Sequence, residues 1–222
     1  MQLEKMDAFF AARLDGYEAH MLKNIDSAEA FYPFTAEQLP DAPGIRILDL
    51  GCGTGLELDW YFRRNPTAGV TGIDLSAEML AVCKEKYPHK ELELICGNYF
   101  TVPLGEQIFD GAVSVESLHH FTKAEKITLY RKLFRALKPG AAFVLTDYFA
   151  LSAAEEALHR QNFMALKAQQ GGEKDEIYHY DTPLTVAHET EALQTAGFDK
   201  IEVLAHWGAT YTIKAEKGVH GK

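Results

Sequence analysis

The chain has 222 residues, which is long enough for a single domain with a well-buried core. No apolar run approaches the roughly 20 residues that cross a bilayer, so neither a membrane span nor a membrane partner is expected. The formal net charge is −10, and no stripe of lysine or arginine is present, which disfavours a nucleic-acid partner. The chain starts without the features of a secretory signal, and its three cysteines cannot all pair with one another, so a cytoplasmic location is expected.

From residue 45 onward, short apolar runs alternate with longer helical stretches. This alternation is typical of a mostly parallel sheet that is wrapped by helices. Strands are predicted at residues 45–50, 69–75, 92–96, 111–115 and 142–147, and two more lie in DKIEVLAHWGATYTIKAEK, hinged near Gly208. Because the last two are closely connected, they are predicted to be antiparallel. The predicted fold is α/β, with seven strands, an antiparallel last strand and helices on both faces.

Capping signals predict where the helices between these strands begin. A serine or threonine can accept a hydrogen bond from the first turn, and a glutamate three residues later completes the capping-box pattern. Thr122 with Glu125 and Ser152 with Glu155 have this pattern. Ser76 begins a further helix, and the last is predicted at residues 185–196.

The whole chain, residues 1–222, is predicted to be one domain in four parts. Residues 1–44 form an N-terminal helical cap, with one helix at 5–24 and another opened by Thr35 and Gln38. Residues 45–150 form the core, 151–183 a lid insertion, and 184–222 the last helix and hairpin. The cap and the lid are the segments that could close over the ligand edge of an open sheet.

The sequence ILDLGCGTGLELDW places three glycines directly after the first predicted strand. Gly51, Gly53 and Gly55 allow close backbone approach to a ligand, and the next helix presents free N–H groups. A P-loop would need Lys-Ser/Thr after the last glycine, where this chain has Leu56 and Glu57. The dinucleotide fingerprint requires glycine at position 56, and Glu57 would repel a pyrophosphate. A carboxylate ligand therefore fits this turn better than a phosphate.

Asp74 ends the second predicted strand, in GIDLS. A carboxylate at this distance from a glycine turn can accept hydrogen bonds from both hydroxyls of a ribose. The combination of LDLGCGTG with this aspartate resembles the class I S-adenosylmethionine-dependent methyltransferases, over about residues 45–150. The resemblance implies a Rossmann-like fold, S-adenosylmethionine as cofactor and S-adenosylhomocysteine as product.

The resemblance also implies roles for individual positions. Asp49 and the glycine turn would hold the methionine portion of the cofactor, Asp74 the ribose, and Leu75 with Met79 the adenine face. Similar enzymes have an aspartate where this chain has Asn98, whose carbonyl could accept the same hydrogen bond. The full set of expected cofactor contacts is Asp49, Leu50, Gly51, Cys52, Gly53, Gly55, Asp74, Leu75, Met79, Asn98, Tyr99, Val115, Glu116 and Tyr17.

His119, His120 and Asp147 are the candidate catalytic residues. In similar enzymes the loop after the fourth strand lies near the transferable methyl, and a histidine there can take a proton from an acceptor hydroxyl. The alternative is that one histidine is structural and that Asp147 only caps its strand. No metal site is expected, because Asp147 is followed by Tyr148 rather than by the asparagine of metal-dependent relatives. Cys52, Cys83 and Cys96 are interpreted as packing residues.

The predicted function is methyl transfer to an oxygen or nitrogen of a small-molecule acceptor, by a monomer or a homodimer. One alternative is an enzyme that makes or uses a carboxylated S-adenosylmethionine. That reaction should need an arginine, and residues 161–181 contain none. A tRNA methyltransferase and a non-enzymatic S-adenosylmethionine-binding protein are two further hypotheses, and the acidic charge disfavours the former.

Overall fold

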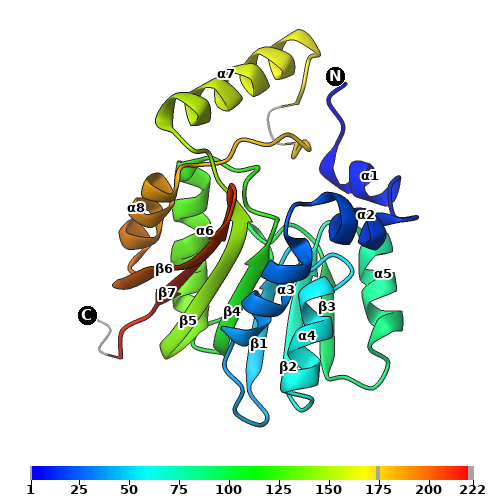
Figure 1. The fold of residues 1–222 in the computed structure, drawn as a ribbon, viewed down its shortest axis with the longest axis vertical. Helices are drawn as coiled ribbons and strands as arrows, with labels where there is room; N and C mark the ends of the chain where they lie inside the picture. Colours follow the sequence, from blue (N-terminus) through cyan, green and yellow to red (C-terminus); the bar gives the residue numbers. More distant parts are fainter. Residues whose placement is uncertain (1, 174–175, 220–222) are drawn as a thin grey trace.

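The computed structural model describes residues 2–173 and 176–219. Seven strands in these residues form one sheet, in the order β3-β2-β1-β4-β5-β7-β6 (Figure 1). From β3 to β5 every neighbouring pair is parallel, whereas β7 is antiparallel to both β5 and β6. The predicted α/β fold is therefore confirmed. The strands are β1 (Arg46–Leu50), β2 (Gly69–Asp74), β3 (Leu92–Cys96), β4 (Phe109–Val115), β5 (Leu137–Tyr148), β6 (Lys200–Trp207) and β7 (Thr210–Glu216).

Helices cover both faces of the sheet (Figure 1). One hydrophobic cluster packs α3 and α4 against the sheet, and a second packs α6 and α8 against it. The inner strands are thus buried on both sides, as expected for parallel strands. The helices are α1 (Met6–Ala11), α2 (Tyr17–Asn24), α3 (Ala28–Glu37), α4 (Leu56–Arg64), α5 (Ala77–Lys86), α6 (Lys123–Ala136), α7 (Ala153–Gln169) and α8 (Val186–Ala196).

The capping signals at Ser76, Thr122 and Ser152 mark helix starts correctly. The Ser76 hydroxyl accepts a hydrogen bond from the N–H of Met79, and Thr122 and Glu125 form both bonds of a capping box. At α7 only half of the box is present, because the Glu155 carboxylate accepts from the N–H of Leu151 instead of Ser152. Caps of this kind stabilise a helix by about 1 kcal/mol each.

Three sequence predictions about the elements are wrong. The helix predicted at 5–24 is two helices, separated by a turn in which Gly16 has φ +83°. Thr35 does not open a helix; it lies in the last turns of α3, and its hydroxyl donates to the carbonyl oxygen of Phe31 at 2.7 Å. The strand predicted at 142–147 begins at Leu137, directly after α6, because the chain pairs with β4 and β7 without an intervening loop.

The N-terminal segment and the segment that follows α7 are joined by backbone hydrogen bonds. The N–H of Met6 donates to the carbonyl oxygen of Ile177, and the N–H of His179 donates to that of Glu4, each at 3.0 Å. The same segment is tied to the loop after β4, where the N–H of Thr182 donates to the carbonyl oxygen of His119 at 2.9 Å. Two segments far apart in sequence, residues 4–11 and 177–182, thus lie together beside the sheet, below α7 in Figure 1. We call these two segments the cover.

Candidate functional site

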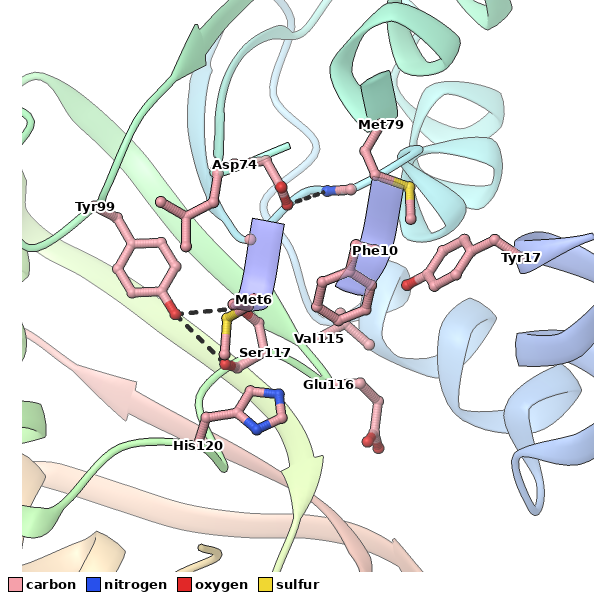
Figure 2. Close-up of a pocket in the computed structure, with 13 residues that line it drawn as sticks. Met6, Phe10, Tyr17, Asp74, Met79, Tyr99, Val115, Glu116, Ser117 and His120 are labelled. Carbon is pink, nitrogen blue, oxygen red and sulfur yellow. Dashed lines mark hydrogen bonds between the residues drawn. The ribbon is translucent and has the colours of Figure 1, made fainter. Parts of the chain in front are cut away.

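A pocket of about 510 Å³, including its part open to solvent, lies at the carboxyl ends of β1, β2 and β4 (Figure 2). This is where ligands bind in open α/β sheets, because the loops after the strands meet there. Nine of the predicted cofactor contacts line its wall, and α1 covers it from one side. The nine are Tyr17, Gly51, Gly53, Asp74, Leu75, Met79, Tyr99, Val115 and Glu116.

All three glycines of the turn have left-handed backbone, and a Cβ atom would be crowded at Gly51 and at Gly55. Gly51 has φ +75°, and a Cβ atom at this position would overlap the hydroxyl of Ser117. Gly53 has φ +49°, and a Cβ atom there would lie 3.9 Å from the Tyr17 hydroxyl, at the pocket wall. Left-handed backbone favours glycine at these positions, and without side chains the turn lets a ligand approach its backbone closely.

The carboxylate of Asp74 faces the same turn (Figure 2). Its Oδ2 accepts a hydrogen bond from the N–H of Gly53 and its Oδ1 accepts from the N–H of Ser76, each at 2.9 Å. Burial raises the pKa of Asp74, and the backbone donors oppose that rise. Each carboxylate oxygen has a second lone pair, so the side chain can still accept two hydroxyl donors from a ligand.

Asp49 and Glu57 form a buried acidic pair beneath the turn. Asp49 is 1% exposed and Glu57 is 4% exposed, and neither oxygen of Asp49 has a hydrogen-bond donor among the described residues. Burial raises the pKa of Asp49, and the charge of Glu57 raises it further. Buried polar groups are normally paired, so this pair fits the cationic amino group of a methionine-derived cofactor.

Five of the predicted contacts lie outside the pocket wall: Asp49, Leu50, Cys52, Gly55 and Asn98. The Oδ1 of Asn98 accepts a hydrogen bond from the N–H of Phe100 at 2.8 Å, which uses one of its two lone pairs locally. Their roles toward the cofactor stay predictions. Cys96 is exposed and is not a core residue, because β3 is the edge strand of the sheet.

Sequence reasoning missed three residues of the wall: Met6, Phe10 and Ser117. Met6 and Phe10 are four residues apart on α1, so they share one face of that helix. Both project into the pocket in Figure 2. Apolar residues at this spacing mark a buried face, but only the fold shows that the face lies over the glycine turn.

The candidate catalytic residues form a polar cluster beside the pocket, and only His120 lines the pocket itself. The Nδ1 of His119 lies 2.6 Å from Oδ1 of Asp147, whose Oδ2 accepts from the N–H of Leu118 at 2.8 Å. Burial alone would lower the pKa of His119, but the carboxylates of Asp147 and Asp181 outweigh burial and raise it.

The pKa of His120 is shifted in the opposite direction to that of His119. Its Nδ1 lies 3.1 Å from the carbonyl oxygen of Tyr180, in the segment that follows α7. Burial, together with the charge of His119, lowers the pKa of His120 to about 3. His120 is therefore a neutral side chain in the pocket wall. Asp181 comes from the same segment as Tyr180, and sequence reasoning gave no signal for it.

Residues 48–145 match the family model described as a methyltransferase domain. The chain contains a class I S-adenosylmethionine-dependent methyltransferase domain. No helix among the described residues is long and apolar enough to cross a membrane.

Two relatives and one solved structure show how far this similarity extends. The chain is 36% identical to 24-methylenesterol C-methyltransferase 3 of Arabidopsis thaliana, over 48% of this chain and 30% of that protein. It is 29% identical to demethylmenaquinone methyltransferase of Lactococcus lactis, over 78% and 73%. A putative O-methyltransferase from Nostoc punctiforme shares the fold of the methyltransferase domain, with TM-score 0.66 and 22% identity over 90% of this chain and 58% of that one. The chain thus spans less than a third of the sterol methyltransferase.

Proposed function

We propose that this chain transfers the methyl group of S-adenosylmethionine to a small-molecule acceptor. The observation that carries the proposal is the pocket itself, in which Asp74 and the glycine turn face one ligand space. The relatives support the substrate class, because one is named for a sterol and one for a quinone. Since the sterol enzyme is a C-methyltransferase, carbon is a candidate acceptor atom in addition to oxygen and nitrogen.

Different residues of the site would bind different parts of the cofactor. Asp49, beneath the turn, would pair with the amino group, the glycine turn would lie against the rest of the methionine portion, and Asp74 would accept the ribose hydroxyls. Leu75, with Met79 beside it, offers an apolar wall for the adenine. When bound, S-adenosylmethionine supplies an electrophilic methyl group on a sulfonium.

The chain itself would align the acceptor with the methyl group and keep water away from it. Alignment alone can supply effective molarities of roughly 10⁵ to 10⁸ M, so methyl transfer needs no base when the acceptor has no proton to lose. Met6 and Phe10 add apolar surface to the pocket wall. His120 lies in the wall where an acceptor would have to approach, and the pair of His119 and Asp147 supports the loop that carries it.

The direct test is a screen of acceptors with S-adenosylmethionine, in which S-adenosylhomocysteine and the methylated product are both quantified. Quinols, sterols, fatty acids and catechols form the first panel. The proposal predicts equal amounts of the two products with at least one acceptor. Asp74→Ala should lower both signals at a cofactor concentration that just saturates the wild type, and higher concentrations should restore part of them. A protein that binds the cofactor but turns over with no class of acceptor would instead be a binding protein.

A further inference from the structure

Three metal-ligating side chains meet where the cover contacts the loop after β4. His119 and His120 come from that loop, and Asp181 comes from the segment that follows α7. One ligand atom of each lies within 4.8 Å of the others. Neither the cofactor pocket nor the proposed methyl transfer requires this convergence. We infer that His119, His120 and Asp181 form a binding site for a divalent transition-metal ion, with Zn²⁺ as the expected occupant.

The distances suit an ion better than they suit hydrogen bonds. The Oδ1 of Asp181 lies 3.4 Å from Nε2 of His119 and 3.4 Å from Nδ1 of His120. Good N–H···O hydrogen bonds are about 2.7–3.2 Å long, so both separations are too great. Ligands about 2.0–2.1 Å from a tetrahedral zinc ion are about 3.3–3.4 Å from one another. The carboxylate oxygen thus lies at the spacing that a shared ion sets.

Asp147 orients the first ligand in the way that metal sites require. Its carboxylate binds Nδ1 of His119 at 2.6 Å, which leaves Nε2 as the free ring atom, facing Asp181. A metal-bound histidine nearly always has its other ring nitrogen bonded to a carboxylate, carbonyl or water. The arrangement of Asp147 and His119, with Nε2 directed toward Asp181, reproduces that pattern.

A second candidate ligand set consists of Glu116, His119 and Asp147. It is the weaker one, because Asp147 already accepts from the backbone N–H groups of Leu118 and Tyr148 as well as from His119. An ion bound there would have to displace these three bonds, whereas an ion at the first set would replace only the contact between Nδ1 of His120 and the carbonyl oxygen of Tyr180. Two imidazoles and one carboxylate, in contrast, are a ligand set that zinc uses with an open fourth position.

The position of the ion would link the cover to the pocket. Asp181 is about half exposed, with 47% of its side chain open to solvent, whereas His120 lines the pocket. An ion between them would fasten the segment that follows α7 to the loop after β4. The backbone bond between Thr182 and His119 also holds this junction, and the ion would take the place of the contact between Tyr180 and His120.

The test is zinc binding to the chelator-treated full chain, followed by calorimetry without S-adenosylmethionine. The expected result is one tightly bound Zn²⁺ per chain. Asp181→Asn and His120→Gln should weaken binding by about tenfold or more, as should Asp147→Asn, by loss of the bond that orients His119. His89→Gln is the matched control, because His89 is exposed in the loop before β3, at the amino ends of the parallel strands, and its loss should leave the affinity unchanged.

Cobalt replaces zinc in a second readout, because the intensity of its visible absorption reports tetrahedral coordination. A strong visible band in the wild type that is lost in Asp181→Asn supports the site. Thermal unfolding without metal shows that each variant is folded. The inference is overturned if the wild type binds no stoichiometric zinc, or if zinc binds equally to the folded Asp181→Asn and His120→Gln variants. Because cofactor binding is not measured, the result is independent of the proposed methyl transfer.

Discussion

Oδ2 of Asp74 accepts a hydrogen bond from the N–H of Gly53, with 2.9 Å between the two atoms. The bond joins the end of β2 to the glycine turn after β1, so the carboxylate and the turn are fixed relative to each other. A ligand that contacts the turn must therefore also meet Asp74. This relationship explains why a 19-residue separation in sequence between Gly55 and Asp74 can build a single site.

Replacing Asp74 tests whether its carboxylate holds the cofactor. Asp74→Ala removes the acceptor for the ribose and for Gly53, and we expect S-adenosylhomocysteine to bind roughly 10- to 100-fold more weakly, since hydrogen bonds to charged groups contribute about 1.5–3 kcal/mol. Asp74→Asn keeps one carbonyl acceptor and should have intermediate affinity. Calorimetric titration measures both. Wild-type affinity in Asp74→Ala would show that this carboxylate does not hold the ligand.

The acidic pair should make cofactor binding depend on pH. The pKa of Asp49 lies well above its usual 3.8 because of burial and the charge of Glu57, so the empty pocket tends to keep a proton there. A cationic amino group favours the ionised form, so binding should release a proton, and affinity should rise as the pH increases toward the raised pKa of Asp49. Titrations in buffers of different ionisation enthalpy count the released proton.

Glu57→Gln is the companion variant. Without the neighbouring charge, the pKa of Asp49 should fall, so the variant should release less than the wild-type amount of proton at neutral pH. The raised pKa of Asp49 affects stability and cofactor affinity in opposite directions as the pH rises. A raised carboxyl pKa stabilises the empty protein at low pH, and this contribution is lost as pH rises through the raised value. A pH-independent affinity in the wild type would contradict the assignment of Asp49.

The contribution of α1 to the pocket can be measured with a pair of methionine variants. Met6 is buried and lines the pocket, so Met6→Ala should weaken S-adenosylhomocysteine binding about fivefold, for a loss of about 1 kcal/mol of apolar contact. Met164→Ala is the matched control, because Met164 is exposed on α7. Stopped-flow dissociation should be faster only for Met6→Ala. Equal rates for the two variants would mean that α1 does not retain the ligand.

A buried ion pair between α6 and α8 gives a test of stability away from the pocket. Lys126 donates to the carboxylate of Glu189, which also accepts from the Tyr130 hydroxyl, and both charged residues are almost fully buried. Lys126→Met leaves Glu189 charged without a cation, and should lower the free energy of unfolding by about 3–5 kcal/mol. Adding Glu189→Leu should recover part of this loss. Urea unfolding measures both variants, and a cost under about 1 kcal/mol for the single change would refute the pair's role.

The sequence predicted the parts of the site that depend on local signals. Gly51, Gly53 and Asp74 follow strands whose apolar pattern is unambiguous, and parallel strands bring their ends together. Met6 and Asp181 could not be placed in this way. They reach the site through contacts between segments far apart in sequence, such as the bonds from Met6 to Ile177 and from Thr182 to His119. Thr35 shows the other limit, because a helix-starting residue type lies inside a helix when its hydroxyl can bond the preceding turn.

The measurement that tests the central claim most directly is calorimetric titration of the wild-type protein with S-adenosylmethionine and S-adenosylhomocysteine, with NAD and ATP as controls. The pocket predicts saturable binding of the first two at one site per chain. The controls should not bind, because Glu57 lies next to the turn where their phosphates would have to be. Binding of NAD or ATP, or no binding of S-adenosylmethionine and S-adenosylhomocysteine, would contradict the assignment of the glycine turn.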